Sequence, residues 1–140
     1  MSKPFHFILS TPDAVLYEGE TEYVGLETPQ GEVGIMADHV PMISLIAPGV
    51  LKIKNSKEEK ILATGAGFVK VTDKKVMAFI QTAEFAESID EQRAMEAQKH
   101  AQMIMSTQAD EISLADATSL LERNIARLKA VEHKKKRSHH

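Results

Sequence analysis

The chain has 140 residues, enough for one ordinary domain or two small ones. Its hydrophobic content is 43% and its aromatic content only 5%, so the core must be built mainly from aliphatic and Met side chains. The absence of Cys excludes disulfides, thiolate metal sites and a Cys nucleophile. The net charge of −3 gives no general attraction to nucleic acid, and no stretch approaches the ~20 apolar residues of a membrane span. Any work at a membrane must therefore be done through a partner.

The first part of the chain carries the pattern of short β-strands. Apolar and polar residues alternate in several runs, and clusters of turn-forming residues separate these runs. Many short strands with regular turn signals are typical of a β-sandwich or a barrel. The expected strands lie within residues 5–9, 15–27, 50–54, 60–63, 68–71 and 76–80. The sequence therefore predicts one all-β domain over residues 1–86.

The period of the apolar residues changes in the last third of the chain, where neither Gly nor Pro occurs from residue 88 onward. Small and apolar residues then recur at helical spacing in two series. We expect an antiparallel two-helix hairpin over residues 87–140. Ser88, three residues before Glu91, and Ser113 should be the N-caps of its helices. The first series is Ala94, Ala97, Ala101 and Ile104; the second, after a break at residues 106–110, is Leu114, Ala117, Leu121, Ile125 and Leu128.

The inward face of the first predicted helix consists mostly of Ala, and this affects how the helix docks. Each Ala buries little area, so at about 25 cal/mol per Å² the free energy of docking stays small. Ala is also the best helix former, so each helix should persist while its docking is weak. A long helix pair of this kind is a candidate moving part.

Residues that could support catalysis are few. The histidines show no HExxH or similar metal spacing, and neither a GxSxG motif nor a Ser/His/Asp set can be assembled. Gly65-Ala66-Gly67 follows a predicted strand without a later Gly-Lys-Ser/Thr, so a turn with tight backbone approach fits better than a phosphate loop. The basic run at residues 134–137 lacks interleaved aromatics and is typical of a solvated tail. We therefore expect no catalytic residues, no metal and no nucleic-acid partner.

Residues 31–43, GEVGIMADHVPMI, are the most unusual part of the first domain. Two glycines bracket Glu32, and the apolar Val33 and Ile35 fall where an exposed turn is expected. One interpretation is a rigid β-turn whose apolar residues tuck under the sheet. The other is a docking loop, in which Val33 and Ile35 are anchors and Glu32 and His39 are polar contacts.

Four segments agree in order and spacing with one known family. GEVGIMADHVPMIS resembles its pattern Gly-Glu-Leu-Gly-Ile-x-x-Gly-His-x-Pro-Leu-Leu-Thr, and LATGAGFVKV resembles one of its strand segments. SIDEQRAMEA is similar to its helix start, and RLKAVEHKKK to the hairpin end of its bacterial members. Over its whole length the chain thus resembles the epsilon subunit of F-type ATP synthases. Asp38 stands where this family usually has Gly, but Asp tolerates a left-handed turn better than most residues, so the turn should survive.

The resemblance implies a ten-stranded β-sandwich followed by a helical hairpin, in a regulatory subunit that is not itself an enzyme. Members of the family bind the rotating gamma subunit and sit on the ring of membrane-embedded c subunits, as part of the central stalk. This implies a peripheral location on the cytoplasmic face of the bacterial inner membrane, reached only through the complex. The loop that would contact the c ring and gamma consists of Glu32, Val33, Ile35 and His39.

The hairpin is the regulatory element of bacterial relatives. It lies folded on the sandwich or extends along gamma into the catalytic head, where it blocks ATP hydrolysis. In the extended form, Arg123, Arg127 and Lys129 would meet acidic segments of the alpha and beta subunits. The same cations near a helix C-terminus also complement the helix dipole, worth about 0.3–1 kcal/mol each. Both interpretations can hold together.

Some bacterial relatives bind ATP in the folded hairpin through a motif Ile/Leu-Asp-x-x-Arg-Ala, which residues 89–94 match. The resemblance therefore implies ATP as a regulatory ligand, with no cofactor required. His100, where the strongest binders carry Arg, would remove one phosphate contact. The alternative is local: Asp90 favours the helix dipole, and Arg93 pairs with Asp90 or Glu96. The implied ATP-binding residues are Glu84, Ile89, Asp90, Arg93, Ala94, Arg123 and Arg127.

A second class of protein also fits these residues. It is a stand-alone β-sandwich adaptor with a helical arm that senses a ligand. The synthase interpretation requires a tight complex with a gamma subunit and the adaptor does not, so copurification with gamma discriminates between them.

Overall fold

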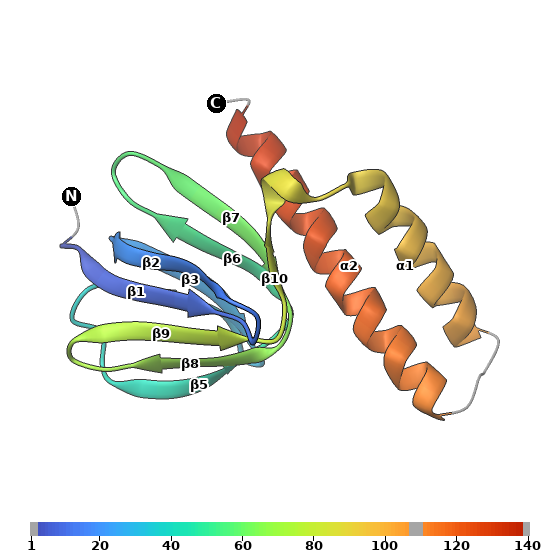
Figure 1. Cartoon of the computed structure of the whole chain (residues 1–140), viewed down its shortest axis with the longest axis horizontal. Helices are drawn as coiled ribbons and strands as arrows, with labels where there is room; N and C mark the ends of the chain where they lie inside the picture. The colour runs from blue at the N-terminus through green and yellow to red at the C-terminus, as the bar shows by residue number, and fades with distance from the viewer. Residues whose placement is uncertain (1–2, 107–110, 139–140) are drawn as a thin grey trace.

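The computed structural model describes residues 3–106 and 111–138, which form a β-sandwich followed by two long helices (Figure 1). Residues 107–110 of the predicted helix connection, together with His139 and His140, lie outside the described residues. The predicted fold class, an N-terminal β-sandwich with a C-terminal helix pair, is confirmed. The strands are β1 (Phe5–Ser10), β2 (Val15–Thr21), β3 (Tyr23–Thr28), β4 (Gly31–Ile35), β5 (Met42–Ile46), β6 (Gly49–Lys54), β7 (Glu59–Thr64), β8 (Gly67–Val71), β9 (Lys75–Ile80) and β10 (Ala83–Phe85).

The strands form two five-stranded sheets. The first sheet has the order β2-β1-β9-β8-β5 and the second has the order β10-β7-β6-β3-β4. Strand β1 pairs in parallel with β9, with Phe7 opposite Val76, whereas its pairing with β2 is antiparallel. The N-terminal strand therefore lies inside the first sheet, with a partner on each side.

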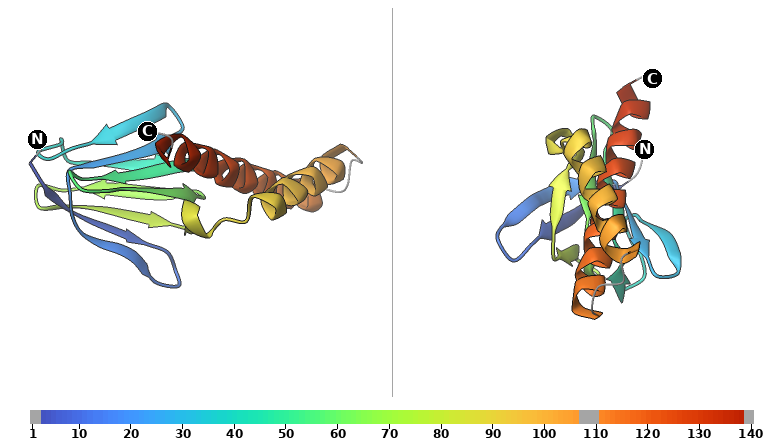
Figure 2. Two further views of the ribbon diagram at one scale, coloured as in Figure 1. Left: turned by 90° about the horizontal axis from the view of Figure 1, so that it is seen from above. Right: turned by 90° about the vertical axis from the view of Figure 1, so that its right-hand side faces the viewer.

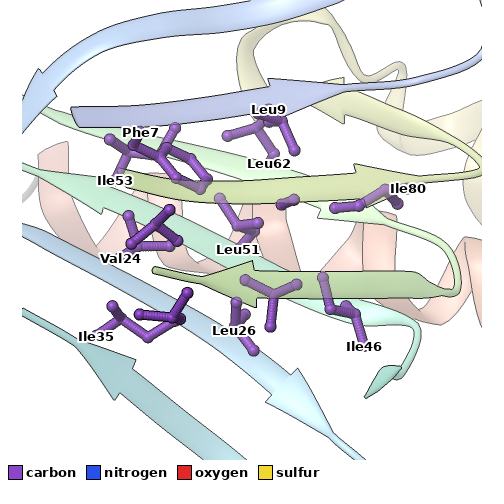
Figure 3. Close-up of a cluster of buried hydrophobic side chains, with 14 residues drawn as sticks. Phe7, Leu9, Val24, Leu26, Ile35, Ile46, Leu51, Ile53, Leu62 and Ile80 are labelled. Atoms are coloured by element: carbon purple, nitrogen blue, oxygen red, sulfur yellow. The ribbon is translucent and has the colours of Figure 1, made fainter. Parts of the chain in front are cut away.

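The core lies between the two sheets and is largely aliphatic, as the composition predicts. Burial alternates along β6, where Leu51 and Ile53 point inward and Lys52 and Lys54 point outward, because successive side chains of a strand face opposite sides of the sheet. Figure 3 shows side chains from both sheets meeting in this layer. The sandwich thus contains a hydrophobic core of its own, formed by Phe7, Leu9, Val24, Leu26, Ile35, Ile46, Leu51, Ile53, Leu62, Val69, Val71, Val76, Ala78 and Ile80.

Residues 31–35 differ from expectation. They form the regular strand β4 rather than an exposed turn, and Val33 and Ile35 pair with Leu26 and Val24 of β3. Ile35 is 0% exposed and belongs to the core, and Val33 packs against it. The docking-loop interpretation was therefore wrong for Val33 and Ile35. Their side chains turn inward, as the other interpretation expected, but they do so from alternate positions of a strand rather than from a turn.

The hairpin consists of α1 (Glu91–Ser106) and α2 (Glu111–Ser138), and the short 3-10 turn η1 (Ala86–Ser88) connects β10 to it. The predicted cap at Ser88 was wrong: Ser88 ends η1, and Asp90 caps α1 by accepting a hydrogen bond of 3.1 Å from the Arg93 backbone N–H. The chain is still extended at Ile89, which places Ser88 too early to reach the first helical amides. The predicted cap at Ser113 was also wrong, since α2 begins two residues before it.

The helix pair docks on the outer face of the second sheet through α2. Ala126 and Ala130 of α2 pack against Ile61 and Ala63 of β7, in a small cluster separate from the sandwich core. Helix α1 lies along α2, farther from the sheets, and the pair projects beyond one side of the sandwich (Figures 1 and 2). The predicted Ala-lined face is present, with buried Ala94, Ala101 and Ala117 between the helices.

Candidate functional site

The outer face of the first sheet carries exposed apolar side chains from three neighbouring strands. Leu45 of β5 pairs with Phe68 of β8, which in turn pairs with Phe79 of β9, so the three side chains form a row. The Phe68 and Phe79 rings stack with their centroids 5.1 Å apart. Ile43 lies on the same face of β5, and Ile43 and Leu45 are 72% and 66% exposed. We call Ile43, Leu45, Phe68 and Phe79 the apolar strip; a contiguous exposed patch of this kind marks an interaction surface.

The apolar strip and the hairpin lie on opposite faces of the sandwich, because the strip is on the outer side of the first sheet and α2 is on the outer side of the second. A groove of about 370 Å³ adjoins the strip, between the rings of Phe68 and Phe79 and the turn at Pro12. A partner can therefore cover the strip without displacing the hairpin.

The residues predicted for the contact loop differ in their accessibility. Glu32 is exposed near the start of β4, whereas His39 lies four residues beyond its end. At about 3.3 Å per strand residue, the two side chains lie near opposite ends of the strand. Val33 and Ile35 point into the sandwich, so Ile35 is corrected from a contact residue to a core residue. Of the four predicted residues, Glu32 and His39 remain accessible.

The turn that follows β4 has the backbone conformation expected for it. Asp38 has a φ of 64°, in the left-handed region that Asp tolerates, and its carboxylate lies 3.4 Å from Lys3 Nζ. His39 Nδ1 lies 2.8 Å from the Val40 carbonyl oxygen. This turn borders a cavity of about 370 Å³ that residues 71–76 close on the other side.

The predicted nucleotide motif surrounds the start of α1. Asp90 caps the helix and lies 3.9 Å from Arg93 Nε, and both side chains are exposed. Ile89 packs against the cluster beneath α2, and Ala94 is buried. The local pairing of Arg93 is therefore with Asp90, which was one of the two acids expected.

The remaining predicted residues lie on β10 and α2. Arg127 of α2 donates from Nε to the carboxylate of Glu84 on β10, and from Nη1 to Asn124 Oδ1 at 3.2 Å. Arg123, one turn earlier on α2, is exposed. The seven residues thus come from β10, the segment before α1, the first turn of α1 and the middle of α2. The contacts between these elements join Glu84 to Arg127, and Ile89 to the cluster beneath α2. In this structure Arg93 and Arg127 are each already paired with an acid.

Burial raises the pKa of Tyr17, and the nearby Glu58 and Glu20 carboxylates raise this pKa further. Its hydroxyl donates to the Glu20 carbonyl at 3.1 Å, and Lys60 Nζ lies 5.5 Å from its ring centroid. The phenol therefore stays neutral as a structural group of the sandwich. Within the described part of the chain, no three His, Asp or Glu side chains gather as metal ligands.

Two features escaped prediction from the sequence. The exposure of Phe68, in the apolar strip, had a local signal in the alternation along β8. Val69 and Val71 point inward, so Phe68 must lie on the outer face of the sheet together with Lys70. The burial of Asn124 had no local signal. Its neighbours in the sequence, Glu122 and Arg123, are charged and exposed, so the sequence around it is typical of a solvated helix face.

Two family models together cover most of the chain. Residues 4–86 match the β-sandwich domain of the ATP synthase delta/epsilon chain, and residues 87–132 match its long α-helix domain. An ATP synthase epsilon chain of Chromobacterium violaceum is 36% identical over 141 aligned residues, which cover 99% of this chain and 100% of that one. The chain belongs to the ATP synthase delta/epsilon family.

Other epsilon chains agree with this assignment. One from Shouchella clausii is 38% identical over 125 residues, covering 89% of this chain and 92% of that one. Among solved structures, a chain in the cryo-EM structure of the Euglena gracilis mitochondrial ATP synthase has a TM-score of 0.79 at 22% identity, covering 88% of this chain and 78% of that chain. A chain in the cryo-EM structure of the central stalk and c ring of the Tetrahymena thermophila mitochondrial ATP synthase has a TM-score of 0.63 at 16% identity. The match covers 93% of this chain and 98% of that chain. Both structures share the fold of this epsilon-family chain.

In the helices that the structure describes, no segment is both long and apolar enough to cross a membrane.

Proposed function

We propose that this chain is the epsilon subunit in the central stalk of an F-type ATP synthase. It has no catalytic role of its own, and it joins the gamma subunit to the c ring at the cytoplasmic face of the bacterial inner membrane. The family membership supports this proposal, as do neighbours of the same fold in the solved stalk and c-ring assemblies. The membrane contact is made through the complex.

The apolar strip is the observation that carries the proposal. Four large apolar side chains remain exposed on the face that the hairpin leaves free, and gamma is the partner that covers them. The experiment is coexpression with the gamma subunit of the same synthase. A stable one-to-one complex supports the stalk role, and failure to form it favours the stand-alone adaptor.

Glu32 is the proposed polar contact to the c ring. Because its side chain is exposed, Glu32→Lys should leave the free energy of unfolding within about 0.5 kcal/mol of wild type. Reversing its charge should lower ATP-driven proton pumping several-fold, since a lysine would face polar loops that accommodate a carboxylate. Pumping by membrane vesicles and urea unfolding of the free chain measure the two effects.

Glu58→Lys is the matched control for Glu32→Lys. Glu58 is also exposed, but it lies in the turn between β6 and β7, and its reversal should leave pumping unchanged. If Glu32→Lys unfolds the sandwich, or if both variants pump equally, Glu32 is not a contact residue.

The hairpin is the proposed regulatory element. In the docked form Arg127 is engaged with Glu84 while Arg123 and Lys129 are exposed. On extension all three cations become available to acidic segments of the alpha and beta subunits, and the extended hairpin inhibits ATP hydrolysis. The alanine-rich docking surface supports this role. A modest difference in a partner's binding free energy for the two forms is enough to shift the equilibrium between the docked and the extended hairpin.

The docked hairpin is also the proposed ATP site. We expect ATP to bind the isolated chain in the millimolar range, because Arg93 and Arg127 must leave their paired acids to reach phosphate. His100, at the position where the resemblance implies an arginine in the strongest binders, would also supply one phosphate contact fewer. Isothermal calorimetry should show that Arg93→Gln weakens binding several-fold, whereas Lys99→Gln on the same helix does not. Absence of heat and of NMR shifts at several millimolar ATP would leave Asp90 and Arg93 with local roles only.

A further inference from the structure

The buried apolar contact between hairpin and sandwich is rich in alanine, which offers little shape to interlock. Its buried residues are Ile61, Ala63, Ala86, Ala126 and Ala130, and the partly buried Val50 and Ile89 pack against them. Alanines present little relief, so α2 could slide or lift at modest cost. A directional contact is needed to select one docked position.

Asn124 supplies the buried end of such a contact. Its side chain is 0% exposed, and every polar atom of it is satisfied: Nδ2 donates to the Leu120 carbonyl at 2.8 Å, and Oδ1 accepts from Arg127 Nη1 at 3.2 Å. Because the amide donor is tied to its own helix, the oxygen can point in only one direction. Asn124 thereby fixes where the Arg127 guanidinium lies.

Arg127 carries the contact across to the sandwich. With Nη1 held by Asn124, its Nε donates to the carboxylate of Glu84. The Arg127 and Glu84 side chains are 24% and 34% exposed, so water screens their attraction only partly. Glu84 is on β10, the strand immediately before the connection to the hairpin. The chain Asn124–Arg127–Glu84 therefore ties the middle of α2 to the fixed side of the joint.

We propose that Glu84, Arg127 and Asn124 form a latch that sets the equilibrium between docked and undocked hairpin, with Asn124 as the positioning residue. The latch rests on the proposed function only in that it assumes a movable hairpin. Glu91 and Lys135 form a comparable pair at 2.8 Å, but it joins α1 to α2 and moves with the hairpin. Breaking that pair should leave docking unchanged, which provides a matched control.

The test measures how often the hairpin undocks from the sandwich in the full chain. Since the chain has no Cys, Ala130→Cys places a single thiol in the buried contact, where a thiol reagent reaches it only on undocking. In this background Glu84→Gln should raise the labelling rate about tenfold, and Asn124→Ala should raise it in the same direction. Glu91→Gln should not raise it. Added salt should speed labelling of the Ala130→Cys parent but not of the Glu84→Gln variant, because only the parent has an ion pair to screen.

A thiol in the sandwich core separates undocking from general destabilisation. Ala78→Cys, on β9, should label at the same rate with and without Glu84→Gln. Equal Ala130→Cys labelling in the Glu84→Gln and Glu91→Gln variants would overturn the latch, as would a parallel rise at Ala78→Cys. Coexpression with gamma reports on the stalk role separately, so either proposal can fail while the other stands.

Discussion

Replacing Phe68 by Glu should weaken binding to the gamma subunit by about 100-fold or more. Phe68 lies in the middle of the row formed with Leu45 and Phe79, and a buried aromatic at the centre of an interface is the usual energetic hot spot. A carboxylate there would be desolvated without a partner when gamma covers the strip. Because Phe68 is 43% exposed in the free chain, the substitution should change the free energy of unfolding of the chain little.

Val15→Glu is the control for Phe68→Glu. Val15 is a strongly exposed apolar residue outside the strip, at the start of β2, so the same change of chemistry there should leave gamma binding intact. Biolayer interferometry with purified gamma gives both dissociation constants, and circular dichroism reports folding. Wild-type affinity in the Phe68→Glu variant would show that gamma binds elsewhere.

Gly67→Ala should destabilise the sandwich by about 3 kcal/mol or more. A Cβ at this position would overlap the Phe79 carbonyl oxygen and would lie 2.8 Å from the Ile80 Cα. Both are backbone atoms of the paired strand β9, so no side-chain rotation can relieve the overlap, and the strands must separate. Urea unfolding followed by circular dichroism measures the loss.

Gly19→Ala is the matched control for Gly67→Ala. Gly19 is also in a strand of the first sheet, but an added Cβ would meet only the Tyr17 hydroxyl at 3.8 Å, an ordinary contact. Its stability should stay within about 0.5 kcal/mol of wild type or rise slightly. Equal loss in the two variants would point to a general cost of Ala in strands rather than to close backbone approach.

The sequence was most informative where the pattern is local. Residues 65–67 were predicted to form a turn with close backbone approach rather than a phosphate loop. The backbone of Phe79 and Ile80 leaves no room for a Cβ at Gly67, which confirms the close approach. The change from strand to helix near residue 87 was equally readable, since Gly and Pro vanish and the spacing of Ala94 and Ala101 is helical. Signals of this kind depend on neighbours within a few residues.

The sequence was least informative where distant segments meet. Leu45, Phe68 and Phe79 form one row only because β5, β8 and β9 pair in a particular register, which no local pattern encodes. One of the two interpretations of residues 31–43 placed Ile35 at the surface, because the neighbouring glycines suggested a turn, yet pairing with β3 turns its side chain inward. The resemblance suggested Glu84 and Arg127 as parts of one site, but their pairing with each other, 43 residues apart, required the fold.

The parallel pairing of β1 with β9 constrains the order in which the chain can fold. Phe7 and Leu9 enter the core from β1, but their neighbours on β9 are synthesised about 70 residues later. Until β9 has been made, β1 can pair within the first sheet only with β2, and a two-stranded pair is by itself marginally stable in water. The first sheet closes when residues 75–80 have left the ribosome, and non-local pairing of this kind is slow. The hairpin emerges last, so its helices should dock onto a sandwich that is already complete.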